Sequence, residues 1–327
     1  MSIQRLSVGI GHSDRMQPLL ERQVVSEQVE LDFDLSAVDN IFWRALHSSD
    51  FDITEMSLAA YGILLSRGQK SFVGIPVFTS RMFRHNSVYV SAAADIATPA
   101  QLAGRRIGVP EYQMTAAVWM RGILQEYYGV KVKDVSWVKG GVNTPGRKER
   151  IALELPSHYD VTEIPADHTL DSYLREGRID ALITAKMPHS FQKKDPAVRR
   201  LFPDTRAAEE EYFRRSSIFP IMHVLVMRRH VYERDPELVR AVYDVFAKAK
   251  SYSEQRLYDP DALSCMVPWL IPEMERTYEI LGQDYWPYGL RKNRKGLSVF
   301  LGYLSDQELL RSPLGVEDLF AEELLDT

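Results

Sequence analysis

The chain has one cysteine in 327 residues, Cys265. A single thiol excludes an internal disulfide framework and a cysteine-rich zinc site, and we expect Cys265 to be a small apolar residue in a packed helix. No apolar run approaches the ~18 residues that a membrane span needs, so no membrane partner is expected. Hydrophobic residues make up 45% of the chain and low-complexity stretches are lacking, which predicts a folded globular protein of about two domains.

The chain also lacks an excess of basic residues. Lys and Arg number 40 against 45 for Asp and Glu, which gives a net charge of −5. Because a protein that binds nucleic acid through its phosphates is usually basic, no nucleic-acid partner is expected. Residues 1–10 have neither the basic start, the apolar core nor the cleavage site of a secretory signal, which predicts a cytoplasmic protein.

Several well-known catalytic motifs are missing. The sequence contains no Gly-x-Ser-x-Gly elbow, no phosphate-binding Walker loop, no GxGxxG fingerprint and no HExxH pair, so the classes that depend on them lose support. The eight histidines show no metal-ligand spacing, and we assign no metal and expect no cofactor. Asp14, Glu55, His85 and His223 could still meet around a divalent ion if the fold brought them together.

Short apolar strands alternate with helical patterns, first in residues 1–97 and again from Thr98. The predicted strands of the first part cover residues 6–10, 29–35, 51–53 and 72–78, and those of the second cover 106–109, 135–138, 161–164 and 179–184. Pro76 predicts an edge strand or a strand end. Residues 113–128 predict a long helix, residues 140–150 a mobile loop, and residues 218–227 a returning strand followed by helices.

This order predicts an α/β fold with mainly parallel sheets and two lobes. Residues 1–95 and 220–327 should form the first lobe, and residues 96–219 an inserted second lobe, with crossings near 92–97 and 217–222. Ligands of such sheets bind beyond the carboxyl ends of strands and against helix N-termini, so we expect the ligand cleft between the lobes.

Polar residues at the strand-to-helix junctions are the candidates for the site. Glu55 lies where a strand gives way to a helix that Ser57 caps, and it is either a cleft carboxylate or a carboxylate that complements the helix dipole. Arg81, Arg84 and His85 follow the strand at 72–78 and suit an anionic ligand, because guanidinium binds carboxylate through two parallel hydrogen bonds. A solvated charged loop is the alternative interpretation.

The inserted part offers a second group. Tyr112, Gln113 and Thr115 precede or open the long helix, where free backbone N–H groups can hold a carboxylate or where these residues simply cap the helix. Thr184 ends a buried strand and could form part of a wall of the site. His223 lies in the apolar stretch at 219–224, and is either a core histidine or a cleft residue that delivers a proton at neutral pH.

The sequence resembles the 4,5-dihydroxyphthalate decarboxylase family from about residue 5 to 310. The segments that carry this resemblance are residues 81–85, 108–119, 177–182, 218–223 and 284–289, with Asn293 and Arg294. That family is similar in fold to the type II periplasmic solute-binding proteins, so the resemblance implies the same two-lobed fold.

The resemblance implies a carboxy-lyase that needs no cofactor and removes carbon dioxide from a hydroxylated aromatic acid, such as 4,5-dihydroxyphthalate to give 3,4-dihydroxybenzoate. Within that chemistry Arg81 and Arg84 would hold the second carboxylate, Glu55 would act on the phenol, and His223 or His85 would protonate the ring. It also implies that Asp14 and Arg15 belong to the site of the small aromatic carboxylate.

Two other classes use the same scaffold. A non-catalytic solute-binding protein for a small carboxylate would have the same fold, and so would an enzyme of cofactor biosynthesis. The missing export signal counts against a transporter component. Carbon dioxide release from a panel of hydroxylated aromatic acids would separate the classes. The sequence leaves a homo-oligomer open.

Overall fold

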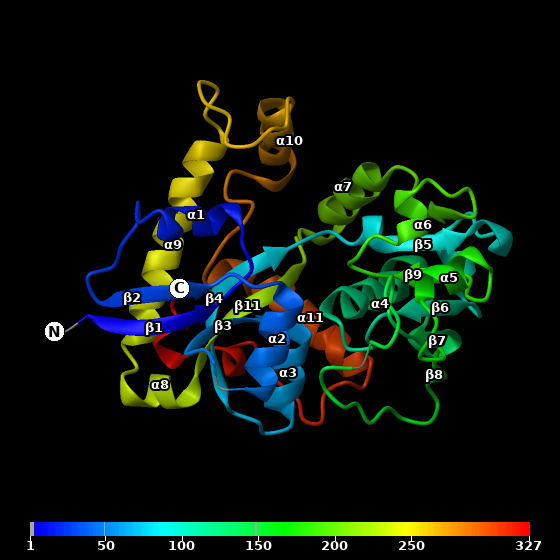
Figure 1. The fold of residues 1–327 in the computed structure, drawn as a ribbon, viewed down its shortest axis with the longest axis horizontal. Helices are drawn as coiled ribbons and strands as arrows, with labels where there is room; N and C mark the ends of the chain where they lie inside the picture. The colour runs from blue at the N-terminus through cyan, green and yellow to red at the C-terminus, as the bar shows by residue number, and fades with distance from the viewer. Residues whose placement is uncertain (1–2, 49, 148) are drawn as a thin grey trace. The chain divides into compact units, whose positions relative to one another are not determined.

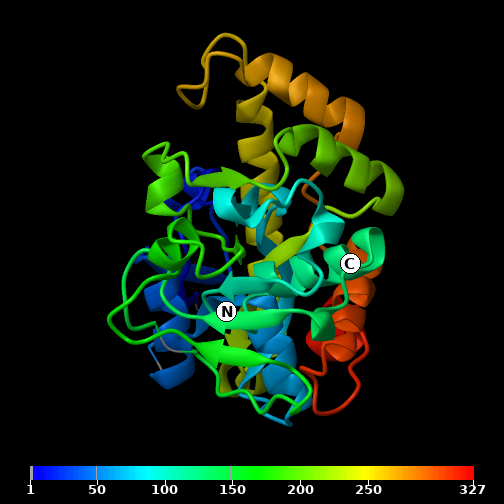
Figure 2. The same cartoon turned by 90° about the vertical axis from the view of Figure 1, so that its right-hand side faces the viewer.

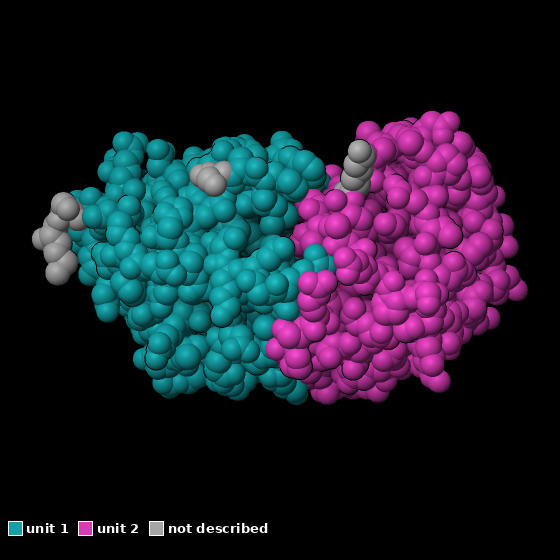
Figure 3. All heavy atoms as spheres, turned by 90° about the horizontal axis from the view of Figure 1, so that it is seen from below, with its two compact units in different colours: residues 1–81, 217–298, 314–327 teal, residues 82–216, 299–313 magenta. Residues whose placement is uncertain are grey.

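The computed structural model describes residues 3–48, 50–147 and 149–327. The chain divides into two compact units, coloured separately in Figure 3: residues 1–81, 217–298 and 314–327 form the first, and residues 82–216 and 299–313 the second. These units differ from the lobes predicted from the sequence in three places. Residues 82–95 and 299–313 group with the second unit, whereas the sequence assigned them to the first lobe. Residues 217–219 group with the first unit, whereas the sequence assigned them to the second lobe.

The first unit is built on a five-stranded sheet with the order β2-β1-β3-β11-β4. Its strands are β1 (Gln4–Gly9), β2 (Val29–Asp34), β3 (Ile53–Ser57), β4 (Phe72–Arg81) and β11 (Ile221–Arg228). β1 pairs in parallel with β2 and β3, and β11 runs antiparallel between β3 and β4. The carboxyl ends of β1, β2, β3 and β4 therefore share one edge of the sheet, where β11 begins.

β4 is the outer strand of this sheet, as Pro76 predicts, because an edge position does not need the missing N–H of proline. The pairing of β4 with β11 is interrupted at the edge that the carboxyl ends share. His223 lies opposite Ser80 and Leu225 opposite Ile75, so residues 76–79 of β4 face the single residue Val224. This irregularity bends β4 where it approaches the beginning of β11.

Helices cover the sheet of the first unit. They are α1 (Gln17–Leu20), α2 (Val38–His47), α3 (Leu58–Ser66), α8 (Arg229–Arg234), α9 (Leu238–Leu257) and α10 (Leu270–Leu281). α9 is the longest and packs its apolar stripe, which includes Val242 and Phe246, against α1 and β4. Figure 1 shows it in yellow across one face of the sheet. α11 (Arg294–Asp306) begins in the first unit and ends in the second.

The second unit has a six-stranded sheet with the order β10-β5-β9-β6-β7-β8, which Figure 2 shows in cyan and green. Its strands are β5 (Val88–Ser91), β6 (Arg106–Val109), β7 (Ser136–Lys139), β8 (Val161–Glu163), β9 (Ala181–Ile183) and β10 (Val198–Arg200). Its helices are α4 (Thr115–Tyr128), α5 (Leu170–Arg175), α6 (His189–Gln192) and α7 (Thr205–Ser216). α4 ends at Gly129, whose φ of 71° is the left-handed conformation that glycine favours after a helix.

Strand pairing explains the boundary at residue 82. β5 pairs antiparallel with both β9 and β10, so the segment that contains it belongs to the second sheet. Residues 299–313 join the same unit because Phe300 and Tyr303 pack on Trp119 of α4. Both sheets combine parallel pairs with antiparallel strands, which is less uniform than the mainly parallel sheets that the sequence predicts.

The alternating elements confirm the α/β class. The cysteine prediction is wrong: Cys265 is exposed and lies in the irregular segment between α9 and α10. The ligand cleft expected between the lobes stays a prediction.

Candidate active site

Six of the predicted site residues lie at one edge of the first sheet. Asp14 and Arg15 follow β1, Glu55 and Ser57 end β3, Arg81 ends β4, and His223 opens β11. The topology brings them together because parallel strands end at the same edge and β11 starts there. Residues from four separate parts of the sequence thus meet where α/β sheets bind ligands.

Glu55 and His223 form a direct pair on neighbouring strands. The Nδ1 atom of His223 is 2.5 Å from Oε1 of Glu55. The other carboxylate oxygen, Oε2, accepts a hydrogen bond of 2.8 Å from the backbone N–H of Gly11. Both oxygens of Glu55 are therefore engaged, and its side chain is only 4% exposed.

The environment of Glu55 keeps it ionised. Burial by itself would raise the pKa of this carboxyl group, because it removes water from the charged form. The charge of His223 and the hydrogen bonds from His223 and Gly11 outweigh burial and hold the pKa of Glu55 below its usual value. A buried carboxylate in this state orients the imidazole and stabilises its protonated form.

The other ring nitrogen of His223 is available to a ligand. Within the described part of the chain, Nε2 has no hydrogen-bond partner, and 20% of the side chain is exposed. The ring packs edge-on against Phe42 of α2, with the centroids 4.9 Å apart and an interplanar angle of 83°. Glu55 and Phe42 thus fix the ring while Nε2 stays open, which is the arrangement that a proton donor needs.

Gly11 approaches Glu55 closely because it has no side chain. A Cβ at this position would lie 2.6 Å from Cγ2 of Val38 and 3.2 Å from Oε2 of Glu55. Any other residue would push the backbone N–H away from the carboxylate. Sequence reasoning missed Gly11, although two glycines with one residue between them at the end of a buried strand were a signal of close backbone approach.

The guanidinium of Arg81 is already hydrogen-bonded within the protein. Nη1 donates to the carbonyl oxygen of Phe219 at 3.0 Å and Nη2 to that of Pro287 at 2.9 Å, and Nη2 also donates to Oδ1 of Asn293. Burial lowers the pKa of Arg81 to about 9, which still leaves it charged at neutral pH. Its role is to tie the segment before α11 to the end of β4.

Arg15 is the more accessible guanidinium of this edge. Nη1 donates to Oδ1 of Asp14 at 2.7 Å and Nη2 to the carbonyl oxygen of Thr79 at 2.9 Å. The guanidinium carbon lies 4.0 Å from the ring centroid of Trp286, whose indole N–H donates to the carbonyl oxygen of Phe78. The side chain of Arg15 is 16% exposed and that of Asp14 46%.

Ser57 has the local role that its position predicts. Its hydroxyl caps α3 by accepting a hydrogen bond of 3.4 Å from the N–H of Ala60. Because Ser57 also lies opposite His223 in the sheet, the cap fixes the strand end that carries the pair.

The other predicted residues belong to the second unit, and there His85 has the character of a core histidine. It is fully buried, with its ring 5.0 Å from that of Phe202 and 5.5 Å from that of Tyr212. Among the described residues neither ring nitrogen has a hydrogen-bond partner. Burial lowers the pKa of His85 to about 4, so the ring is neutral at neutral pH and is a poor proton donor.

Arg84 is also buried, unlike the solvated loop or the open anion site that the sequence suggested. Burial lowers the pKa of Arg84 to about 10, and the charge of Glu209 opposes that shift. The helix α7, which carries Glu209 and Tyr212, packs against the segment that holds Arg84 and His85.

The junction of β6 and α4 contains Tyr112, Gln113 and Thr115, all of them buried. Gln113 donates to Glu111 at 3.2 Å, and the backbone N–H of Tyr112 donates to Oε1 of Glu149 at 2.8 Å. The residue that organises this junction is Glu111, which sequence reasoning missed.

Glu111 is 1% exposed and forms ion pairs with Arg147 and Arg150. Burial would raise the pKa of Glu111, but the two arginines hold it below the usual value. The segment predicted as a mobile loop is therefore anchored to the start of α4.

Thr184 has a local structural role. Its hydroxyl donates to the carbonyl oxygen of Lys186 and accepts from the N–H of Lys186, both at 3.1 Å. This closes a tight turn after β9 and leaves the hydroxyl little capacity for a ligand.

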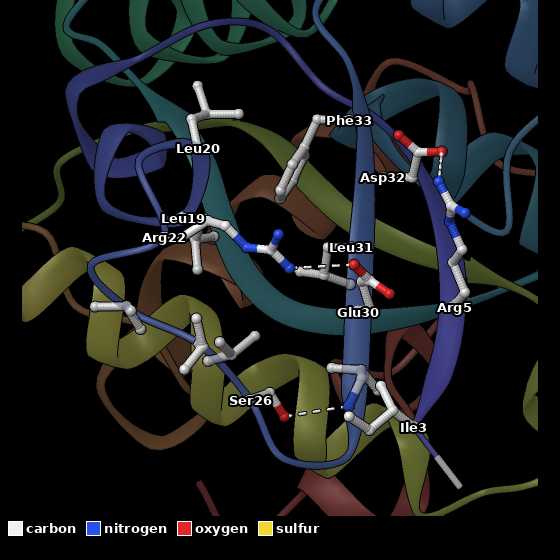
Figure 4. Close-up of a pocket in the computed structure, with 14 residues that line it drawn as sticks. Ile3, Arg5, Leu19, Leu20, Arg22, Ser26, Glu30, Leu31, Asp32 and Phe33 are labelled. Carbon is white, nitrogen blue, oxygen red and sulfur yellow. Dashed lines mark hydrogen bonds and ion pairs between the residues drawn. The ribbon is translucent and has the colours of Figure 1, made fainter.

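A separate groove of about 450 Å³ lies beside β2, and Figure 4 shows it between that strand and the segment that follows α1. Leu19, Leu31, Phe33 and Val245 are among its apolar lining residues. Its arginines are already paired, Arg5 with Asp32 and Arg22 with Glu30, each at 3.1 Å. None of the predicted site residues lines this groove.

Two other properties concern the whole described chain. Across residues 3–48, 50–147 and 149–327, no three His, Cys, Asp or Glu side chains gather closely enough to hold a metal ion. The same residues contain no helix of the length and apolarity that a bilayer crossing demands.

Comparison with known proteins extends these observations. The chain is 38% identical over 327 residues to a 4,5-dihydroxyphthalate decarboxylase of Comamonas testosteroni, covering 100% of this chain and 99% of that protein. It is 39% identical over 214 residues to a 4,5-dihydroxyphthalate decarboxylase of Pseudomonas putida, covering 65% of this chain and 83% of that protein. No family model matches the sequence.

Solved structures share the fold at low identity. The periplasmic sulfonate-binding protein of Methylobacillus flagellatus KT matches with a TM-score of 0.58 and 11% identity, covering 99% of this chain and 93% of that one. The periplasmic aliphatic sulphonate binding protein of Escherichia coli matches with a TM-score of 0.55 and 14% identity over the whole of both chains. The predicted periplasmic-binding-protein-like fold is confirmed, and the full-length identity places the chain in the 4,5-dihydroxyphthalate decarboxylase family.

Proposed function

We propose that this protein is a carboxy-lyase that converts 4,5-dihydroxyphthalate to 3,4-dihydroxybenzoate and carbon dioxide. The observation that carries the proposal is the 38% identity to a 4,5-dihydroxyphthalate decarboxylase over essentially the full length of both chains. The fold alone would support a binding protein equally well, because one scaffold serves many functions. The Glu55–His223 pair adds a chemical reason for the enzyme.

The reaction needs one proton at the ring carbon that carries the departing carboxylate. The hydroxyl para to that carbon supplies electrons to the ring and loses its own proton, so that ring protonation gives a dienone-like intermediate. The bond between the ring and the carboxylate then breaks, its electron pair restores the aromatic ring, and carbon dioxide leaves. The phenol oxygen recovers a proton, so the net reaction consumes one proton and releases one carbon dioxide.

His223 is the residue that delivers this proton. In its doubly protonated form, Nδ1–H donates to Glu55 and Nε2–H is directed to the ligand. After the transfer, the neutral imidazole keeps its Nδ1–H bond to Glu55, so the ring holds its orientation between turnovers. Glu55 is then a positioning residue, in place of the role on the phenol that the sequence suggested, because both of its oxygens are engaged within the protein.

The test is incubation of the purified protein with 4,5-dihydroxyphthalate in D₂O. Carbon dioxide should be released, and the 3,4-dihydroxybenzoate formed should carry one deuterium at the carbon that lost its carboxylate. A product without deuterium at that carbon would contradict ring protonation by an exchangeable acid.

The competing function is a binding protein for a small carboxylate. Two results together would support this function instead of the enzyme. A ligand would raise the melting temperature and be recovered unchanged, and no hydroxylated phthalate or benzoate would release carbon dioxide. We also propose a cytoplasmic location for the protein, which fractionation of the native cells would test.

A further inference from the structure

We propose that Arg15 binds the carboxylate that stays on the ring. This inference rests on the proposed function for the identity of the ligand, and it assigns to Arg15 the task that the sequence gave to Arg81 and Arg84. It concerns the edge of the first sheet only, where Arg15, Arg81, Glu55 and His223 lie at adjoining strand ends.

The first step is the elimination of Arg81. Three acceptors of the protein occupy its terminal nitrogens, and the residue is 6% exposed. A ligand carboxylate would have to compete with these three contacts for a guanidinium that is almost fully buried. Losing such buried contacts costs about as much as a new charged hydrogen bond contributes.

The second step is the state of Arg15 itself. Nη1 and Nη2 each make one hydrogen bond and each has a second N–H, and the side chain is partly exposed. Its carboxylate partner, Asp14, is almost half exposed, so this ion pair is weak and leaves the guanidinium able to bind a second anion. The stack on Trp286 and the bond to Thr79 hold the guanidinium plane in place before a ligand arrives.

The third step is the position and charge of Arg15. Thr79, whose carbonyl oxygen accepts from Arg15, is the neighbour of Ser80, and Ser80 lies opposite His223 in the sheet. Arg15 also lies close enough to Arg81 for the two positive charges to interact. Among the described residues, Asp14 is the carboxylate that is hydrogen-bonded to Arg15, while the charges of Glu254 and Asp284 also act on Arg15 and Arg81. The remaining N–H groups of Arg15 are therefore the donors that an anionic ligand can bind.

The chemistry decides which carboxylate Arg15 holds. A guanidinium bound to the departing carboxylate would stabilise its charge in the ground state, and that charge is lost in the transition state. Such a contact would slow the reaction. The carboxylate that remains on the ring is charged throughout, so an arginine can hold it and orient the ring without opposing the loss of carbon dioxide.

The experiment measures binding, so that it does not depend on turnover. Calorimetry with 3,4-dihydroxybenzoate and with catechol, which has the same hydroxyls and no carboxylate, gives the contribution of the carboxylate to affinity. Arg15→Met should lower the affinity for 3,4-dihydroxybenzoate by about 30-fold or more, because truncating one member of a desolvated charge pair has effects of this size. The same variant should change the affinity for catechol by less than about twofold. Arg15→Lys keeps the charge but not the fork and should show an intermediate loss.

Arg5→Met is the matched control. Arg5 pairs with Asp32 at the surface of the same sheet, so its loss should leave both affinities unchanged. The proposal is overturned if Arg15→Met binds 3,4-dihydroxybenzoate with the affinity of the parent. It is also overturned if the affinities for catechol and for 3,4-dihydroxybenzoate fall by the same factor. A parent protein that binds neither compound, or binds both equally, would overturn it too. If the carboxylate selectivity depends on Arg15 but no carbon dioxide is released from 4,5-dihydroxyphthalate, the decarboxylase function fails and the Arg15 assignment stands.

Discussion

The Glu55 carboxylate receives hydrogen bonds on both oxygens, and only one of them comes from His223. This matters because a carboxylate with a single partner can rotate, whereas the bond from Gly11 fixes the plane of the group. The imidazole is then held by a rigid partner on one side and by the edge of Phe42 on another. The free energy of proton transfer depends on such fixed orientation, since a displaced donor loses its alignment with the ring carbon.

Replacement of Glu55 tests this arrangement. Glu55→Gln keeps the size of the side chain and one acceptor oxygen but removes the charge that stabilises the protonated imidazole. We expect kcat for decarboxylation to fall by about 100-fold or more, while the affinity for 3,4-dihydroxybenzoate changes little.

The matched control is Glu30→Gln on β2 of the same sheet, where an exposed carboxylate pairs with Arg22. Its kcat should equal that of the parent. Equal kcat values for Glu55→Gln and the parent would remove Glu55 from the positioning of the proton donor. A loss of affinity with unchanged kcat would instead make the pair a binding device.

At the scale of elements, much of the fold was predictable. The apolar runs at 72–78 and 106–109 became β4 and β6, and the helical spacing at 113–128 became α4. The cap at Ser57 and the edge position of Pro76 also follow from local rules. These features depend on residues close together in the chain, which is why one sequence is enough to find them.

The pairing of strands was not predictable in the same way. β5 follows β4 within a few residues, yet it pairs with β9 and β10 in the other sheet. No pattern within the strand decides between two sheets, because an apolar strand fits either of them. The same limit applies to Arg81 and Arg15, whose partners Pro287, Asn293 and Trp286 are more than 200 residues away.

The bonds of Arg81 lead to a prediction about the segment that precedes α11. Arg81→Met removes the donors that hold Phe219 and Pro287 to the end of β4. We expect the free energy of unfolding to fall by about 2–3 kcal/mol, because Oδ1 of Asn293 and two backbone carbonyl oxygens each lose a charged donor. Denaturant-induced unfolding would measure this.

Arg229→Met provides the comparison for Arg81. Arg229 also donates to backbone carbonyl oxygens, those of Lys70 and Phe72, but it is only partly buried. Arg229→Met should lower the free energy of unfolding by less than about 1 kcal/mol. If Arg81→Met unfolds like the parent and instead loses affinity for 3,4-dihydroxybenzoate, Arg81 is the ligand arginine after all.

At the scale of the whole molecule, the fold and the chemistry depend on different residues. The chain shares its fold with sulfonate-binding proteins at 11–14% identity and its family with decarboxylases at 38–39% identity. A shared fold at such low identity preserves the core pattern of the sheets and does not need to preserve polar residues at strand ends. The chemistry therefore depends on a few side chains, of which Glu55 and His223 form a hydrogen-bonded pair at the beginning of β11.

The stability of the whole protein in acid follows from His85. In the unfolded chain its pKa has the ordinary value of 6.5, and burial in the folded protein lowers it to about 4. Between these values the unfolded state binds a proton that the folded state excludes, so stability is complete above pH 6.5 and is lost as the pH falls toward 4. pH 5 lies about 1.5 units below 6.5, which corresponds to about 2 kcal/mol. Protonation of His85 in the unfolded state should therefore lower the free energy of unfolding of the parent by about 2 kcal/mol between pH 7.5 and pH 5.

The comparison uses His85→Phe, which suits a site lined by Phe202 and Tyr212 and has no proton to gain. Urea-induced unfolding at pH 7.5 and pH 5 should show that this variant loses about 2 kcal/mol less than the parent over that interval. His230→Phe, at an exposed histidine, should lose as much as the parent. If His85→Phe and the parent lose equal stability, the ring of His85 is already protonated in the folded protein at pH 5. His85 would then regain its place as a candidate acid, and the assignment of the ring proton to His223 alone would have to be withdrawn.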